Sequence, residues 1–281
     1  MSSTKGVKQR ISNVRTTKQI MRAMDMVAAT KLQKARVRLE TTRPLYQEAK
    51  RIIDNIKNIE EARDNTFIQR NKVKSTAYVV ITSDKGLCGS YNINISQKAL
   101  AHMRDKNEKI LVIGSKGSEY FKRRNKNIVR RITDLSEARM YEGSSLMGER
   151  LASMYVSGEV DEIFLAYTYF QSTLNYIPRV ERMLPVSDEP INSAKAGIMK
   201  YEPDVDIFLD HAIPLYLHAY LYAATAESIA CEHAARMVNM ESASKNATEI
   251  LEDLNRMYNR KRQAGITQEL NEIVGGANIL R

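Results

Sequence analysis

Proline is scarce in this 281-residue chain, and it is unevenly placed. All six prolines lie between Pro44 and Pro214, which leaves 43 residues before this interval and 67 residues after it without any. Proline interrupts helices more strongly than any other residue, because it lacks the backbone N–H and its ring clashes with the preceding turn. We therefore expect two long helices that bracket a compact middle.

Long apolar runs are also missing. The longest, such as residues 77–82 and 163–167, are the length of strands, whereas a helix needs about 20 apolar residues to cross a bilayer. The first eleven residues are basic and lack the apolar stretch and the small-residue cleavage site of an export signal. We expect a protein that is not integral to the membrane and stays in a compartment reached without export, in a bacterium the cytoplasm.

Cysteine occurs only as Cys88 and Cys231, in segments that we expect to belong to different structural units. No CxxC pair and no histidine cluster accompanies them, so no metal site is predicted. A structural disulfide is not expected in a reducing compartment. We expect both cysteines to be ordinary small side chains, buried or half-buried.

Both ends of the chain carry apolar residues at alternating steps of four and three, which is the heptad pattern of a helix that winds around a partner helix. At the front these are Val7, Ile11, Val14, Met21, Ala28, Leu32, Ala35, Leu39, Tyr46, Ala49, Ile53 and Ile56. At the back they are Met237, Met240, Ala247, Leu251, Leu254 and Tyr258, and after a shift of phase Ile266, Leu270, Ile273, Ala277 and Leu280. The two stripes can bury each other in a long antiparallel coiled coil, in which the longer back helix ends without a partner.

Positive charge is concentrated at the front. The chain carries a net charge of +10, and residues 1–43 hold eleven Lys and Arg against Asp25 and Glu40, a local balance of +9. Residues 207–281 have a balance of −2, although they contain a basic cluster of Arg256, Arg260, Lys261 and Arg262. This distribution predicts an acidic partner surface around the paired helices, with a solvated helix face as the simpler alternative.

The middle of the chain follows a different rhythm, in which short apolar runs alternate with amphipathic stretches. It predicts strands at 77–82, 109–114, 128–132, 162–170 and 176–184, and helices at 92–107, 115–124 and 136–157. We therefore predict an α/β fold class, with a Rossmann-like domain at 75–200 inserted between coiled-coil helices at 1–60 and 205–281. Pro214 either kinks the last helix or delays its start.

No catalytic or cofactor-binding constellation emerges. The loop at 83–90 follows a strand but fits neither GxGxxG nor GxxxxGK[ST], so we interpret it as a tight turn that needs flexible backbone at Gly86 and Gly89. None of the four histidines is paired with an obvious nucleophile. We predict no catalytic residue, no cofactor and no metal.

Five sequence blocks resemble the γ subunit of F-type ATP synthases. They are residues 22–31 (RAMDMVAATK), 83–94 (SDKGLCGSYNIN), 201–204 (YEPD), 232–240 (EHAARMVNM) and 262–273 (RQAGITQELNEI). The blocks follow the order of the family and extend along almost the whole chain. The resemblance is therefore highly specific.

The resemblance implies a non-catalytic central-stalk rotor that transmits torque between an ion-driven c-ring and the catalytic ring of three α and three β subunits. It implies that the α/β domain stands near the c-ring and the ε subunit, at the cytoplasmic face of the cell membrane, with the membrane reached only through the c-ring. By motif match, the contacts with the α3β3 ring are Met24, Lys261, Arg262, Gln263, Thr267 and Glu269, and those with the c-ring or ε are Tyr201 and Glu202. The middle domain lacks the cysteine-bearing insertion of chloroplast members, so thiol control of rotation is not expected.

Two alternatives rest on the same residues. The basic front helix and a pI near 9.4 also suit a coiled-coil protein that binds nucleic acid, for which affinity would fall steeply with salt. Asp25 lies inside the basic run, however, and the basic residues surround the helix instead of following one edge. The second alternative is an enzyme that uses the α/β domain, for which the 75–200 fragment would bind a nucleotide.

Overall fold

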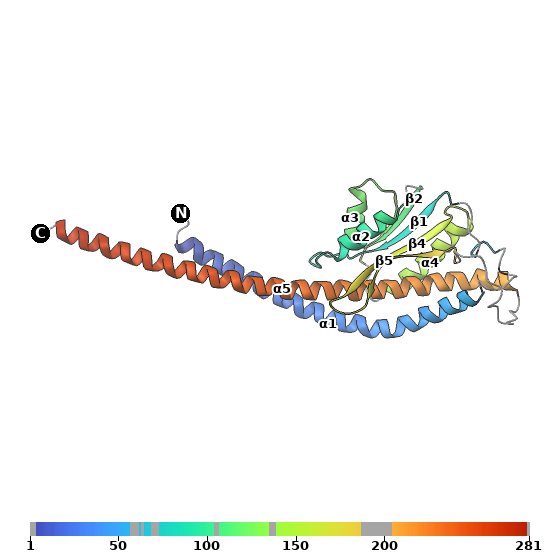
Figure 1. Cartoon of the computed structure of the whole chain (residues 1–281), viewed down its shortest axis with the longest axis horizontal. Helices are drawn as coiled ribbons and strands as arrows, with labels where there is room; N and C mark the ends of the chain where they lie inside the picture. The colour runs from blue at the N-terminus through green and yellow to red at the C-terminus, as the bar shows by residue number, and fades with distance from the viewer. Residues whose placement is uncertain are drawn as a thin grey trace. The chain divides into compact units, whose positions relative to one another are not determined.

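The computed structural model describes residues 4–56, 62, 65–68, 73–103, 107–134, 139–186 and 204–279, with side chains as far as residue 273. Its elements, labelled in Figure 1, are α1 (Thr4–Ile56), β1 (Thr76–Ile81), α2 (Tyr91–His102), β2 (Glu108–Ile113), α3 (Ser115–Lys122), β3 (Ile128–Ile132), α4 (Met140–Val156), β4 (Glu162–Phe170), β5 (Tyr176–Leu184) and α5 (Val205–Ile279). The chain forms two compact units, Ala29–Arg236 and the pair Met1–Ala28 and Met237–Arg281. Both long helices contribute to both units.

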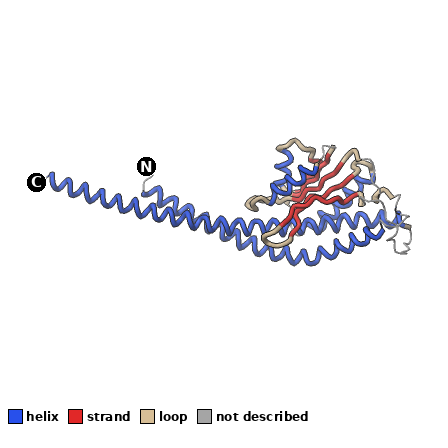
Figure 2. The backbone as a smooth tube through the Cα atoms, viewed as in Figure 1, coloured by secondary structure: helices blue, strands red, loops and turns tan. Residues whose placement is uncertain are grey.

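The larger unit is built on a five-stranded sheet with the order β3-β2-β1-β4-β5, drawn in red in Figure 2. The first four strands are parallel, and β5 is antiparallel to β4. Parallel neighbours require crossover connections, which α2, α3 and α4 supply. Each predicted strand is present, and the predicted α/β class is confirmed.

Helices cover both faces of the sheet, because side chains of successive strand residues point to opposite faces. On one face, Tyr78, Val80 and Ile110 pack against residues of α2 and α3 such as Ile95 and Phe121. The opposite face packs against α1, α4 and α5 in a larger core, which includes Ala77, Val79, Ile81, Leu165, Ile53, Leu151, Leu209, Ile213 and Leu217. Full burial of one such aliphatic side chain stabilises the fold by about 1.5–3 kcal/mol. The larger core holds the sheet against the two long helices.

Strand β3 forms one edge of the sheet. Its first and last residues, Ile128 and Ile132, are half-buried, while Val129, Arg130 and Arg131 are exposed. The strand pairs only with β2 among the described residues. Two consecutive arginines, Arg130 and Arg131, are therefore exposed at this open sheet edge, on opposite faces of the strand.

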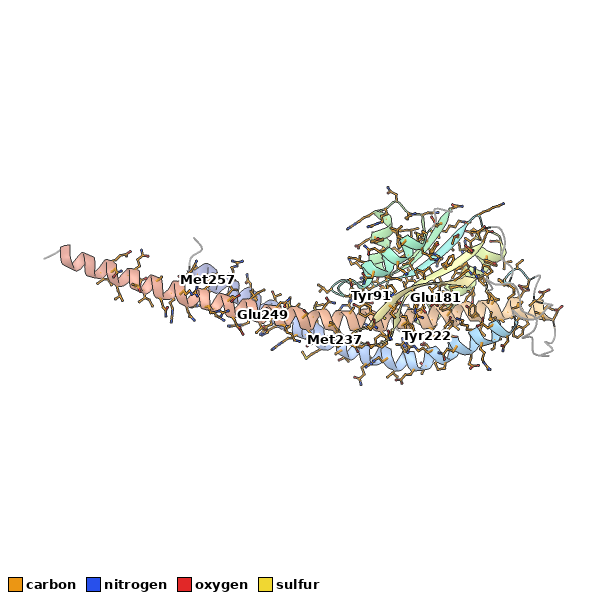
Figure 3. All side chains as sticks on the ribbon, in the orientation of Figure 1. Tyr91, Glu181, Tyr222, Met237, Glu249 and Met257 are labelled. Carbon is orange, nitrogen blue, oxygen red and sulfur yellow. The ribbon has the colours of Figure 1, made fainter. Side chains whose placement is uncertain are left out.

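The smaller unit consists of the N-terminal part of α1 and the C-terminal part of α5, which pack on each other. Val7 and Ile11 are buried against Leu254, with Leu251 and Tyr258 beside them. These residues belong to the predicted heptad stripes, so the coiled-coil pairing is confirmed here. Past Tyr258 the predicted stripe is open, since Ile266, Leu270 and Ile273 are 49%, 56% and 68% exposed. Figure 3 labels Met237, Glu249 and Met257 along the part of α5 that belongs to the smaller unit.

Two local expectations change with the structure. Helix α5 begins at Val205, so Pro214 does not delay its start and lies inside the helix. At the loop 83–90, Gly89 has the expected positive φ of 56°, but the other left-handed residue is Leu87, with φ 63°, and not Gly86. The side chain of Leu87 is 60% exposed, so only the backbone strain of this conformation has to be offset by the loop. The expected domain limits at 1–60, 75–200 and 205–281 stay predictions.

Candidate partner-binding surfaces

The residues that the sequence assigns to the α3β3 ring lie in the smaller unit. Met24 is half-buried on α1 and Lys261 is half-buried on α5. The other four are exposed on α5: Arg262, Gln263, Thr267 and Glu269. The four exposed side chains follow Tyr258, which still packs against the apolar cluster that α5 forms with Val7 and Ile11 of α1. Their exposure makes these four side chains accessible to another protein.

The backbone of this segment is an unbroken helix. The hydroxyl of Thr267 donates to the carbonyl oxygen of Gln263 at 2.9 Å, and the amide of Gln268 donates to the carboxylate of Glu272 at 2.9 Å. The pair Gln268–Glu272, at a spacing of four residues, stabilises the helix by a few tenths of a kcal/mol. The helix presents polar side chains together with the exposed Ile266, Leu270 and Ile273. A surface of this composition, apolar with a polar rim, suits a protein partner.

Most of the basic side chains of α1 are also exposed. They are Lys5, Lys8, Arg10, Arg15, Arg22, Lys31, Lys34, Arg36, Lys50 and Arg51. Arg43 is different, since it forms an ion pair with the buried Glu227 of α5 at 2.6 Å. Sequence reasoning counted Arg43 in the basic cluster that predicts an acidic partner surface. It missed this pair, because the two residues are 184 positions apart and no local pattern joins them.

The loop at 83–90 is held by hydrogen bonds to three other segments. The carboxylate of Asp84 accepts hydrogen bonds from the backbone N–H of Ser115 at 2.9 Å and from that of Asp134 at 2.8 Å. Arg236 of α5 donates to the carbonyl oxygen of Gly86 at 3.2 Å and to the carboxylate of Glu232 at 2.7 Å. The charged groups of the loop are thus used to fix its conformation, in agreement with the interpretation of a structural turn.

Burial changes the acidity of the groups on α5 that face this loop. Burial raises the pKa of the Glu232 carboxyl, an effect that Arg236 opposes. Burial, followed by the charges of Arg236 and Lys31, lowers the pKa of His233 to about 4. His233 is therefore neutral at physiological pH.

The two cysteines are free and buried, as expected. Burial raises the pKa of Cys231 far above its ordinary value, so its thiol stays protonated. Its Sγ lies 3.4 Å from the carbonyl oxygen of Thr168. Cys231 is a packed side chain and not a reactive thiol.

The remaining predicted contacts, Tyr201 and Glu202, lie outside the residues that the structure describes. Within the described ranges, no group of three or more His, Cys, Asp or Glu side chains is arranged to hold a metal ion. None of the described helices combines the length and the apolar character needed for a membrane span.

These observations define a class of protein in which two terminal helices pair with each other and an α/β domain is inserted between them. The model of the family described as ATP synthase matches residues 3–280. The ATP synthase gamma chain of Alkaliphilus metalliredigens is 39% identical, with 98% of each chain covered. The sodium ion specific ATP synthase gamma chain of Acetobacterium woodii is 36% identical, over 98% of this chain and 97% of its own. The chain therefore belongs to the ATP synthase family, among relatives that are gamma chains.

Solved structures agree with this assignment. A chain from the central stalk and c-ring structure of the Tetrahymena thermophila mitochondrial ATP synthase is 25% identical, with a TM-score of 0.65, 80% of this chain and 99% of that chain covered. A chain of the Euglena gracilis mitochondrial ATP synthase has a TM-score of 0.74 over 99% of this chain and 94% of its own, at 18% identity, and shows the common fold. These relatives give the nucleic-acid alternative no support.

Proposed function

We propose that this chain is the central-stalk rotor subunit of an F1Fo ATP synthase, which transmits torque between the ion-driven c-ring and the catalytic α3β3 ring. The observation that carries the proposal is a match to gamma chains over almost the whole chain, 98% of it in the relative from Alkaliphilus metalliredigens. The paired helices of the smaller unit, built from Val7, Ile11 and Leu254, suit a shaft. Because the two helices are wound on each other, they resist twisting better than one helix would.

The chain needs no catalytic chemistry for this role. A shaft that is not symmetric makes different contacts with three identical β subunits, and each set of contacts favours a different conformation of the nucleotide site. Rotation of the shaft then changes the affinity of each site in turn, which is a coupling between sites by differential contact. The catalytic sites belong to the α3β3 ring, and this chain acts as a non-catalytic subunit.

The contacts with the ring are assigned to the exposed segment of α5 and to one residue of α1. They are Met24, Lys261, Arg262, Gln263, Thr267 and Glu269. The exposure of four of these side chains supports the assignment, as does the positive charge of the front helix, which complements an acidic partner surface. Tyr201 and Glu202 are assigned to the contact with the c-ring and ε. The subunit is then peripheral at the cytoplasmic face of the membrane, which it reaches only through the c-ring.

Co-expression with the α and β subunits tests the proposal directly. We expect a stable complex that contains one copy of this chain per three β subunits, measured by native mass spectrometry. A chain that is folded, yet never co-purifies with β, would contradict the proposal. Isothermal titration calorimetry of residues 75–200 with nucleotides tests the enzyme alternative, for which binding is required.

The assigned ring contacts are tested by charge reversal in the assembled complex. We expect Arg262→Glu combined with Gln263→Leu to lower ATP hydrolysis or ATP-driven ion pumping. The matched control is Lys98→Glu combined with Gln97→Leu, because these neighbours are exposed on α2 and have no assigned contact. Turnover and pumping equal to those of the unmodified complex would remove Arg262 and Gln263 from the contact surface.

A further inference from the structure

The C-terminal end of β4 extends beyond its neighbour β1. The parallel pairing of the two strands runs from Thr76 and Glu162 to Val80 and Ala166. Beyond Ala166, β4 pairs with β5 alone, as far as Phe170 and Tyr176. Backbone N–H and C=O groups on the β1 side of β4 are therefore left without a partner strand beyond Ala166. When such groups are buried, they need hydrogen bonds from other parts of the protein.

Side chains of the long helices replace the missing strand. The N–H of Thr168 donates to the hydroxyl of Ser228 at 3.4 Å, and the thiol of Cys231 donates to the carbonyl oxygen of Thr168 at 3.4 Å. The N–H of Phe170 donates to the carboxylate of Glu227 at 2.6 Å. Three residues of one face of α5 thus continue the hydrogen bonding of β4 where β1 ends. In Figure 1, α5 runs beside β4 and β5 within the larger unit.

Helix α1 completes this arrangement through Arg43. Its Nη2 donates to the carbonyl oxygen of Phe170 at 2.6 Å, and its Nε donates to Oε1 of Glu227 at 2.6 Å. The same Nη2 lies 3.0 Å from Oε2 of Glu227, so the ion pair is bidentate. Glu227 is only 4% exposed. The N–H and the C=O of Phe170 are therefore both bound by one ion pair, to which α1 contributes Arg43 and α5 contributes Glu227.

This arrangement, which we call the Phe170 clamp (Arg43, Glu227 and the backbone N–H and C=O of Phe170), differs from the apolar contacts of the larger core. The larger core is apolar, and apolar contact has no preferred direction. Charge-assisted hydrogen bonds are directional and are about twice as strong as neutral ones, and the planar guanidinium fixes their geometry. The clamp therefore opposes sliding of either helix along β4 in a way that apolar packing does not.

We propose that the Phe170 clamp is the force-bearing joint through which the α/β domain and the two long helices turn as one body. The proposal rests on the proposed rotor function. Arg43 and Glu227 are positioning residues, since they act by holding the helices and the strand in register. Without the clamp, the same torque would turn the α/β domain through a larger angle before the helices follow.

The test is a measurement of torsional stiffness in the assembled complex. Because Cys88 and Cys231 are both buried, a cysteine introduced by Lys122→Cys on α3 gives one exposed attachment point for a bead on the α/β domain. With the α3β3 ring fixed and the rotor paused, the angular variance of the bead reports the compliance between ring and domain. Arg43→Lys and Glu227→Asp keep both charges, but they lose the two-pronged geometry or shorten the carboxylate. We expect each to increase the angular variance at least about twofold.

Two controls separate the clamp from general effects. Arg51→Lys makes the same chemical change on the same helix, in an exposed pair with Glu48 that touches no strand. Ile53→Val weakens the larger core without touching the clamp. Both controls are expected to leave the variance unchanged. The proposal is overturned if complexes with Arg43→Lys and with Glu227→Asp assemble and rotate, yet show the same angular variance as the unmodified rotor. Failure of the unmodified chain to assemble or rotate overturns the rotor function instead.

Discussion

Replacement of Gly114 by alanine tests how β2 passes into α3. Gly114 has a φ of +96°, and its N–H donates to the carbonyl oxygen of Ile132 at 2.8 Å. A Cβ atom at this position would lie 2.6 Å from the carbonyl carbon of Thr82 and closer still to its oxygen. Both atoms belong to the backbone at the end of β1, so no side-chain rotation can relieve the contact. Only a shift of the strand or of the turn could do so.

The expected loss of stability has two parts. An alanine held at φ 96° and ψ 141°, a region used almost only by glycine, costs about 1–3 kcal/mol, and forcing an extra carbon into a packed site costs about 1–3 kcal/mol. Gly114→Ala should therefore lower the free energy of unfolding by about 2–6 kcal/mol, a large part of the roughly 5–15 kcal/mol that holds a domain together. The measurement is urea unfolding of the purified chain, followed by circular dichroism.

Alanine substitutions at two other glycines separate the backbone part of this loss of stability from the steric part. Gly158 has a φ of +70°, but no atom lies within 4 Å of the place that an added methyl group would occupy, so Gly158→Ala should show the backbone part alone. Gly86 also has open space and has no positive φ, so Gly86→Ala should be close to neutral. The order of loss is expected to be Gly114, then Gly158, then Gly86. Equal losses for Gly114→Ala and Gly158→Ala would refute the argument from steric contact with Thr82.

The remaining predictions concern α5. The pKa of His233 is about 4, below its ordinary value of 6.5, so between these values the unfolded chain binds a proton that the folded chain does not. The free energy of unfolding should therefore fall by about 3 kcal/mol as the pH drops from 6.5 to 4. In urea unfolding at the two pH values, His233→Gln should remove this part of the fall. The control His211→Gln, at an exposed position, should not remove it. Gly265 lies inside the helix with open space around it; Gly265→Ala should stabilise that turn by about 1 kcal/mol. Slower hydrogen exchange of the neighbouring amides would show this, and unchanged exchange would contradict it.

The periodic parts of the fold were accessible from the sequence. The front stripe marks a real buried face, since Val7, Ile11, Ala28, Leu32, Ala35, Leu39, Ile53 and Ile56 are all buried. The strands of the middle domain could be recognised because buried parallel strands are continuous apolar runs, as in 76–81, where every residue is buried. Regular elements produce such local repeats in the sequence. Their existence and order were therefore predictable.

Contacts between distant segments were not accessible in this way. Nothing near Arg43 distinguishes it from the exposed arginines of the same helix, and its partner Glu227 is set by how α1 and α5 pack beside β4. The loop at 83–90 shows the same limit: the left-handed conformation falls on Leu87 instead of Gly86, and the carbonyl oxygen of Gly86 accepts a hydrogen bond from Arg236, 150 positions along the chain. The assigned ring contacts depend on another molecule, and they stay predictions.

The open edge formed by β3 has a consequence for the chain before it binds another protein. An uncovered strand is a template on which a second copy can add its own strand, and growth by such addition leads to insoluble fibres. Arg130 and Arg131 are both exposed on this strand. Two copies brought edge to edge would bring like charges on these arginines near one another, and their repulsion would oppose the pairing of the strands. We therefore expect the two exposed arginines to slow such growth.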